Sequence, residues 1–325
     1  MADRLHRTIL LRCLLAGFRQ VAPPRRHRRL PAAPPALWRR RRRVTTDLWG
    51  AFRRTSLGPR TLTAVLGAPL LLGGLWLGGA WWAALLGVIV LLGVVEFGRL
   101  HPDVPRAGQA LTPAGALLVA ILALRATGLL AVLFFFGALS VLSIALSYGL
   151  TAPIAPEARW RGWKAVLVGA VYLGLPAGLL LRWRLEAPFA ALGWLFAIIW
   201  ANDIAAYFVG LAAGKHKIVP QISPGKSWEG ATAGLVAGAV VGSLGAPVWG
   251  LHAGGGAILG AMASVVSQSG DLLESAMKRR AGVKDSGAIL PGHGGVLDRF
   301  DGVLVAVPLA YLSLAAAAML RAALR

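Results

Sequence analysis

Long apolar windows separated by short polar stretches run through most of this chain. A window of about 20 apolar residues is long enough to cross the roughly 30 Å of hydrocarbon in a bilayer. Nine such windows can be read from the sequence, at residues 61–78, 80–97, 109–126, 129–148, 164–182, 190–212, 229–248, 251–270 and 302–320. The pattern predicts an all-α fold, a polytopic membrane helix bundle of about nine transmembrane helices.

The start of the chain differs in composition from the rest. Residues 25–43 are dominated by Pro and Arg, and a segment of this kind cannot bury an apolar core. We therefore expect a basic, disordered N-terminal extension over residues 1–55 and a membrane-embedded domain over residues 56–325. One hypothesis for the extension is that it tethers the protein to acidic lipid.

Composition supports a membrane protein and changes how the net charge is interpreted. Only 14% of the residues are charged, against about 25% in a soluble domain. A net charge of +21 could indicate nucleic-acid binding. However, nearly half of the Lys and Arg residues precede residue 61, and the others mostly flank apolar windows. Basic flanks hold the cytoplasmic side of a membrane, so we expect membrane lipid and no nucleic acid as a partner.

The charges of the loops predict an orientation. If the basic N-terminus stays in the cytoplasm, the count of windows puts segments 98–108, 149–163, 213–228 and 271–301 on the same side, and these carry most of the basic loop residues. Both polar regions described below, around 213–228 and 271–301, are then expected to face the cytoplasm.

One window carries polar residues on a single helical face. They are Ser264, Ser267, Gln268, Asp271, Glu274, Ser275 and Lys278. Their spacing places them on one side of a helix, as a stripe about 21 Å long. Polar groups that face hydrocarbon are costly, so the stripe predicts a functional site that faces protein or a cavity, with helix packing as the alternative.

Carboxylates at both ends of the polar segment suggest a metal site. Asp298 and Asp301 are three residues apart at the start of the last window, so they can point the same way. Mg²⁺ binds carboxylate oxygens and shares the phosphates of its substrate. Asp271, Asp298 and Asp301 can form such a site if the segment between them folds back. For Asp298 alone, a helix N-cap is the alternative.

The segment between these carboxylates contains groups suited to phosphate. Glycines flank His293, and backbone N–H groups there can approach an anion closely. The cations that match phosphate oxygens are Lys278, Arg279, Lys284 and Arg299. Anchoring at the membrane surface is the alternative for Lys278 and Arg279, and a plain loop histidine is the alternative for His293.

A second polar region lies upstream. Asp203, inside a predicted span, needs a metal, a cation or the hydroxyl of Tyr207 as a partner. Gly225-Lys226-Ser227 imitates the end of a P-loop, but the required first glycine would fall at Pro220 and we predict no strand before it. We therefore reject a P-loop and keep Lys226 as a phosphate-binding candidate, with surface anchoring as the alternative.

Small residues recur every fourth position in the seventh window, at Gly230, Gly234, Gly238 and Gly242. Such a ridge lets another helix approach closely. It predicts a packing contact inside the bundle, with a dimer contact as the alternative.

Residues 275–301 resemble the signature of the phosphatidate cytidylyltransferase family, also called CDP-diacylglycerol synthases. The likeness shows no departure across these 27 positions and extends from about residue 61 to the end. The matching elements are Ser275, Met277, Lys278-Arg279, Lys284-Asp285, Gly287, Leu290-Pro291, His293-Gly294-Gly295-Val296 and Asp298-Arg299-Phe300-Asp301.

The resemblance implies transfer of CMP from CTP to phosphatidic acid, giving CDP-diacylglycerol and pyrophosphate, in phospholipid biosynthesis. It implies a Mg²⁺-dependent nucleotidyltransferase, with a second cation left open, and a multi-pass protein of the cell inner (cytoplasmic) membrane that forms a homodimer. As metal ligands the resemblance implies Asp271, Asp298 and Asp301, with Asp203 as a weaker candidate. As catalytic residues it implies Asp271, Lys278, Asp298 and Asp301. The residues it implies around the phosphates are Ser223, Lys226, Arg279, Lys284, His293, Gly294, Gly295 and Arg299.

Two other functions remain open at this point. A CTP-dependent lipid kinase would keep the membrane site and change the group transferred. A secondary transporter would use Asp203 and the polar stripe to bind an ion, although transporters usually contain internal repeats, and we see none in this sequence.

Overall fold

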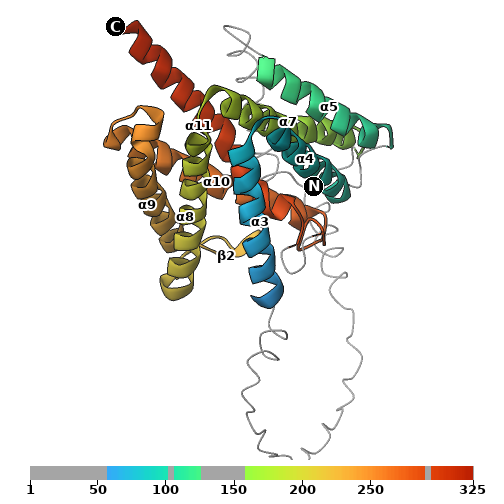
Figure 1. Cartoon of the computed structure of the whole chain (residues 1–325). Helices are drawn as coiled ribbons and strands as arrows, with labels where there is room; N and C mark the ends of the chain where they lie inside the picture. Colours follow the sequence, from blue (N-terminus) through green and yellow to red (C-terminus); the bar gives the residue numbers. More distant parts are fainter. Residues whose placement is uncertain (1–56, 102–105, 126–157, 290–293, 325) are drawn as a thin grey trace, which may run out of the picture. The chain divides into compact units, whose positions relative to one another are not determined.

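A computed structural model of the chain describes residues 57–101, 106–125, 158–289 and 294–324 (Figure 1). The predicted N-terminal extension and the predicted window at residues 129–148 lie outside this part. The described helices are α3 (Leu57–Leu77), α4 (Gly79–Leu100), α5 (Arg106–Arg125), α7 (Ala158–Glu186), α8 (Phe189–Ala213), α9 (Trp228–Gly245), η2 (Ala246–Trp249), α10 (Ala253–Arg280) and α11 (Leu297–Ala323).

Five of the described helices are long and apolar enough to cross a membrane, so the protein is a multi-pass membrane protein. These candidate spans are Gly79–Leu100, Lys164–Glu186, Phe189–Ala213, Trp228–Trp249 and Leu297–Ala323. Two shorter apolar stretches, Val65–Leu77 and Leu111–Arg125, lie in α3 and α5. The all-α membrane fold is therefore confirmed in outline, whereas the described residues do not confirm the count of nine spans.

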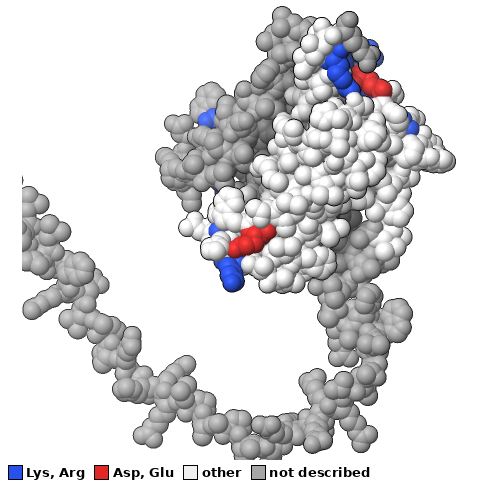
Figure 2. All heavy atoms as spheres, turned by 90° about the vertical axis from the view of Figure 1, so that its left-hand side faces the viewer, with Lys and Arg blue, Asp and Glu red and all other residues white. Residues whose placement is uncertain are grey.

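The surface of α8 and α9 agrees with a lipid environment. Ile204, Phe208 and Leu211 of α8 are exposed, and so are Val236 and Leu244 of α9. Figure 2, which views the side on which α9 lies in Figure 1, shows a broad face without Lys, Arg, Asp or Glu, and charged groups lie above and below it. An apolar band between two charged edges is what a spanning protein presents to a bilayer.

Neighbouring helices pack along one another in pairs, and α10 takes part in two of these pairs. α5 packs along α7, α8 along α9, and both α9 and α11 pack along α10 (Figure 1). Buried indoles join further elements: Nε1 of Trp82 in α4 donates to the carbonyl oxygen of Leu180 at 3.2 Å. Nε1 of Trp249 in η2 donates to the carbonyl oxygen of Ala191 at 3.2 Å. A buried indole N–H needs such a partner, so these contacts help to fix the arrangement.

The glycine ridge of α9 is used inside the bundle. Gly230, Gly234, Gly238 and Gly242 are all buried. A Cβ atom on Gly234 would meet Asn202 of α8, and one on Gly238 would meet Ser264 of α10. Packing inside the bundle is therefore confirmed, because the ridge lets α9 lie against two helices at once.

A short hairpin interrupts the helices and was missed by the all-α prediction. Strand β1 (Lys217–Val219) pairs antiparallel with β2 (Ser223–Ser227), and Lys217 lies opposite Ser227. Pro and Gly inside β2 have low strand propensity, which concealed the hairpin in the sequence. The expectation that no strand precedes Gly225-Lys226-Ser227 is thus wrong, although Pro220 still excludes a P-loop.

The ridge yields a test of packing. Replacement Gly238→Leu should lower stability by about 1–3 kcal/mol, because overpacking forces neighbours apart. Thermal unfolding in detergent would measure the effect. Val236→Leu is the matched control, since Val236 lies on the same helix and is 58% exposed. Equal melting temperatures for the two variants would contradict the packing described above.

Candidate functional site

Three carboxylates from two helices meet beside the polar stripe of α10. Asp271 and Glu274 are three residues apart on α10 and therefore lie on one face of it. Asp301 lies in α11, which packs against α10. One carboxylate oxygen of each residue lies within 4.8 Å of those of the other two. The expected convergence of Asp271 with Asp301 is thus present, and Glu274 is the third member of this carboxylate cluster.

The cluster has the properties of a cation site. Glu274 is fully buried, and burial raises the pKa of its carboxyl above the usual range. Among the described residues, Glu274 Oε1 and the buried hydroxyl of Tyr172 have no hydrogen-bond partner. A hard divalent cation with its water ligands would compensate the buried charge, so these residues fit Mg²⁺.

Lys226 of the hairpin reaches the exposed side of the cluster. Its Nζ lies 2.7 Å from Asp271 Oδ2 and donates to the carbonyl oxygen of Gln268 at 3.0 Å. The side chain of Asp271 is 44% exposed, whereas that of Glu274 is 0% exposed. The cluster is therefore open at Asp271, and Lys226 lies at the opening as a cation beside the carboxylates.

A chain of amides connects this opening to Asp203. Nε2 of Gln268 donates to Asn202 Oδ1 at 2.7 Å, and Nδ2 of Asn202 donates to Asp203 Oδ1 at 2.9 Å. Asn202 is fully buried, so the amide pair satisfies polar groups between α8 and α10. Asp203 is not a member of the carboxylate cluster, and its predicted weaker role as a metal ligand stays a prediction.

Asp298 and Lys278 bind each other beside the cluster. Lys278 Nζ lies 2.5 Å from Asp298 Oδ1 and 3.2 Å from Glu274 Oε2. Burial by itself would lower the pKa of Lys278, but the carboxylates of Glu274 and Asp298 outweigh it and raise that pKa. Asp298 Oδ2 also accepts hydrogen bonds from the backbone N–H groups of Ser286 and Gly295, at 2.9 and 2.7 Å.

This geometry bears on two predicted roles. Asp298 lies outside the cluster of three and binds the segment that precedes α11. Its predicted role as a metal ligand stays a prediction. Lys278, whose side chain is 12% exposed, directs its ammonium to carboxylates. Its predicted catalytic role also stays a prediction.

The other predicted phosphate-binding residues lie around the same end of α10. Arg279 Nε donates to the carbonyl oxygen of Ile222 at 3.2 Å and so connects α10 to the turn of the hairpin. Ser223 is partly buried in β2, and Lys284 and Arg299 are exposed. Gly294 has a φ of +80°, a conformation that favours glycine. His293 lies outside the described residues.

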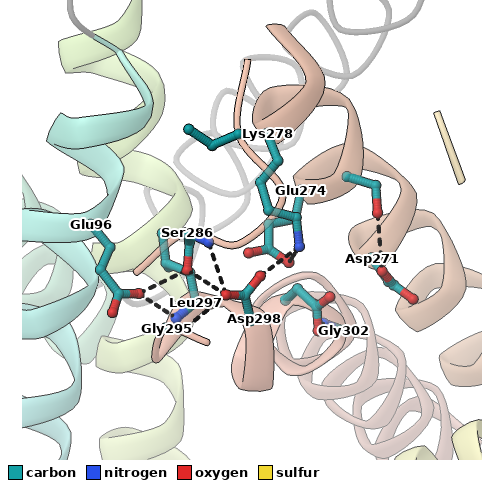
Figure 3. Close-up of polar contacts among 12 residues, drawn as sticks. Glu96, Asp271, Glu274, Lys278, Ser286, Gly295, Leu297, Asp298 and Gly302 are labelled. Atoms are coloured by element: carbon teal, nitrogen blue, oxygen red, sulfur yellow. Dashed lines mark hydrogen bonds and ion pairs between the residues drawn. The ribbon is translucent and has the colours of Figure 1, made fainter. Parts of the chain in front are cut away.

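The sequence analysis missed Glu96 of α4. This residue is fully buried and accepts hydrogen bonds from Ser286 Oγ at 3.0 Å and from the N–H groups of Val296 and Leu297 at 2.9 Å each. Figure 3 shows the carboxylate of Glu96 directed toward Ser286 and Leu297. The available signal was a single carboxylate within the apolar run of α4, because such a residue is costly unless it has partners.

Comparisons with known proteins show the family to which the chain is similar. A model of the cytidylyltransferase family matches residues 58–317. A phosphatidate cytidylyltransferase of Pseudomonas aeruginosa is 40% identical over 259 residues, which cover 78% of this chain and 94% of that protein.

Other relatives match over shorter stretches. A phosphatidate cytidylyltransferase of Brucella suis is 47% identical over 155 residues, 47% of this chain and 57% of that protein. A phosphatidate cytidylyltransferase of Bacillus subtilis is 45% identical over 123 residues, 36% of this chain and 45% of that protein. The chain thus spans little more than half the length of the Brucella relative that it matches.

The carboxylate cluster can be tested by direct metal binding. Glu274→Gln should weaken Mn²⁺ binding to the purified protein by at least about 10- to 100-fold. Loss of an outer-shell partner has an effect of this size, and loss of a direct ligand should have no smaller one. Electron paramagnetic resonance of free Mn²⁺ would measure the affinity. The control is Glu186→Gln, because the carboxylate of Glu186 accepts from Arg182 and Tyr311 and lies outside the cluster. An affinity unchanged by Glu274→Gln would exclude Glu274 as a ligand.

Proposed function

The chain belongs to the cytidylyltransferase family, and on this premise we propose that it is a phosphatidate cytidylyltransferase. It transfers CMP from CTP to phosphatidic acid and forms CDP-diacylglycerol and pyrophosphate. The observation that carries the proposal is the carboxylate cluster of Asp271, Glu274 and Asp301, which lies where the polar stripe of α10 meets apolar helices. A lipid headgroup and a water-soluble nucleotide can both reach such a place.

The reaction requires little chemistry from side chains. An oxygen of the phosphatidic acid phosphate attacks the α-phosphorus of CTP and forms a P–O bond. The bond from the α-phosphorus to the oxygen that bridges to the β-phosphate breaks, and its electron pair leaves with pyrophosphate. A phosphate monoester is largely ionised at neutral pH, so no base is needed to create the nucleophile. The protein must instead hold two polyanions in line and stabilise the charge that develops.

The residues divide this work according to their positions. Asp271, Glu274 and Asp301 would hold Mg²⁺, and this ion would supply positive charge to neutralise the phosphates. Lys226 lies at the exposed carboxylate of Asp271, so a phosphate oxygen that enters there meets its ammonium. Lys278 binds Glu274 and Asp298 and keeps both carboxylates in place.

Further phosphate contacts would come from the other residues that the resemblance to the family carries over. We assign them to Ser223, Arg279, Lys284, His293, Gly294, Gly295 and Arg299. Arg279 supports this assignment by its position at the turn of the hairpin, next to the strand that carries Lys226. Donors on both α10 and β2 would then surround one pyrophosphate group.

We place this site on the cytoplasmic side of the inner membrane, within nine spans. The basic residues of segments 213–228 and 271–301 support that orientation, since cytoplasmic loops are enriched in Lys and Arg. A homodimer is part of the proposal by resemblance to the family. Its interface must lie elsewhere than the glycine ridge of α9, which is buried within one chain.

A radiolabel distinguishes the proposed reaction from a kinase. With purified protein, phosphatidic acid and Mg²⁺, label in the α-phosphate of CTP should enter lipid, and label in the γ-phosphate should not. Asp271→Asn should reduce turnover by at least about 100-fold, because it removes charge from the metal site. Glu186→Gln, whose carboxylate binds Arg182 and Tyr311 outside the site, serves as the control. Transfer of the γ-label would identify a CTP-dependent kinase instead.

Lys226 provides a separate test of phosphate binding. Lys226→Ala should lower kcat/KM for CTP about 10- to 100-fold, since hydrogen bonds to charged groups contribute roughly 1.5–3 kcal/mol. Lys217→Ala is the control, because Lys217 is exposed on the neighbouring strand. If both variants had wild-type kinetics, the assignment of Lys226 to the phosphates would be wrong.

A further inference from the structure

Glu96 caps α11 from a helix that lies far away in the sequence. Val296 is the N-cap residue of α11, and its own side chain offers no cap to the helix. The first N–H groups of a helix have no partner within it, so they need an acceptor from elsewhere. The two oxygens of Glu96 accept from the N–H groups of Val296 and Leu297 at 2.9 Å each. A carboxylate is well suited to this place because the N-terminus of a helix is electropositive.

Glycines pack closely against the carboxylate of Glu96. A Cβ atom on Gly295 would meet both Glu96 and Ser286, and a Cβ atom on Gly287 would lie 2.6 Å from Glu96 Oε1. Among the described residues, no Lys or Arg forms an ion pair with Glu96. Its charge is therefore compensated by N–H and O–H donors of one segment, and these donors must stay in position.

A continuous chain of polar contacts leads from Glu96 to the carboxylate cluster (Figure 3). Ser286 Oγ lies 3.0 Å from Glu96 Oε2 and 2.9 Å from Asp298 Oδ2. Asp298 Oδ1 binds Lys278 Nζ, which also binds Glu274 Oε2. The hydroxyl of Ser286 has one proton and therefore serves one carboxylate at a time. Glu96 and Asp298 are thus coupled through a single hydroxyl.

We propose that Glu96 is a positioning residue for the carboxylate cluster. By capping α11 it sets the start of the helix that carries Asp301, and through Ser286, Asp298 and Lys278 it sets the place of Glu274. Glu96 itself does not belong to the cluster. The proposal rests on the proposed function only in that the cluster binds a divalent cation. Outer-shell partners of this kind typically change metal affinity about 10- to 100-fold when they are removed.

The test uses the purified full chain and two measurements. Glu96→Gln preserves the size of the side chain but replaces one acceptor oxygen by an NH₂ donor that faces other donors. We expect the amides of Val296 and Leu297 to exchange hydrogen about tenfold faster or more, and Mn²⁺ to bind about tenfold more weakly. Glu186→Gln is the matched control, because the carboxylate of Glu186 accepts from Arg182 and Tyr311 outside the site. This control should change neither measurement.

A second variant separates positioning from loss of the fold. Ser286→Ala leaves the bonds from the N–H groups of Val296 and Leu297 to Glu96 in place and removes the hydroxyl that lies between Glu96 and Asp298. It should therefore weaken Mn²⁺ binding and leave the exchange of Leu297 unchanged. If Glu96→Gln does not fold, the Ser286→Ala variant alone decides. Wild-type Mn²⁺ affinity in Ser286→Ala would then overturn the proposal. For a folded Glu96→Gln, unchanged exchange or unchanged Mn²⁺ affinity overturns it.

Failure of the proposed function would look different. A wild-type protein that bound no Mn²⁺ would refute the metal site. The exchange measurement, which needs no ligand, would then decide alone whether Glu96 holds the start of α11. Faster exchange of Val296 and Leu297 in Glu96→Gln would support that positioning, and unchanged exchange would overturn it.

Discussion

The compensation of buried negative charge between α10 and α11 governs the arrangement of the site. Glu274 is fully buried beside Asp271 and Asp301, and carboxylates repel one another unless cations or donors lie between them. Lys278 approaches the cluster from the buried side and Lys226 from the exposed side. In the proposed function, a divalent cation at these carboxylates would complete the balance of charge.

This constraint explains why the site contains segments from so many parts of the chain. A helix in lipid can satisfy its own backbone, but it cannot satisfy polar side chains or the N–H groups at its start. α10 therefore needs the hairpin, which contributes Lys226, and α8, which contributes Asn202. α11 needs α4, which contributes Glu96. The close approach of α9 through its glycines allows α8 and α10 to lie near enough for the amide pair to form.

The site was predictable where its residues are close in sequence and share a helical face. Asp271, Asp298 and Asp301 were predicted to converge, and the cluster in the structure contains Asp271 and Asp301. Glu274 was recognised in the polar stripe but not as a member of the cluster. Asp298 and Asp301 share a helical spacing, yet the structure directs Asp298 to Lys278 and the segment before α11. Spacing alone could not predict that Asp298 and Asp301 have different partners. The partner of each carboxylate depends on which residue of another segment lies opposite it.

The sequence by itself determined that this is a helical membrane protein with a polar site beside its last span, and its signature indicated the family. Apolar length, basic flanks and helical spacing are local properties, so they can be read directly. Only the tertiary structure decided that Glu274 completes the cluster and that Glu96 caps α11. It also decided that Pro- and Gly-containing residues 223–227 form a strand. These features depend on contacts between residues up to 201 positions apart, and no local pattern records which distant donors meet a buried carboxylate.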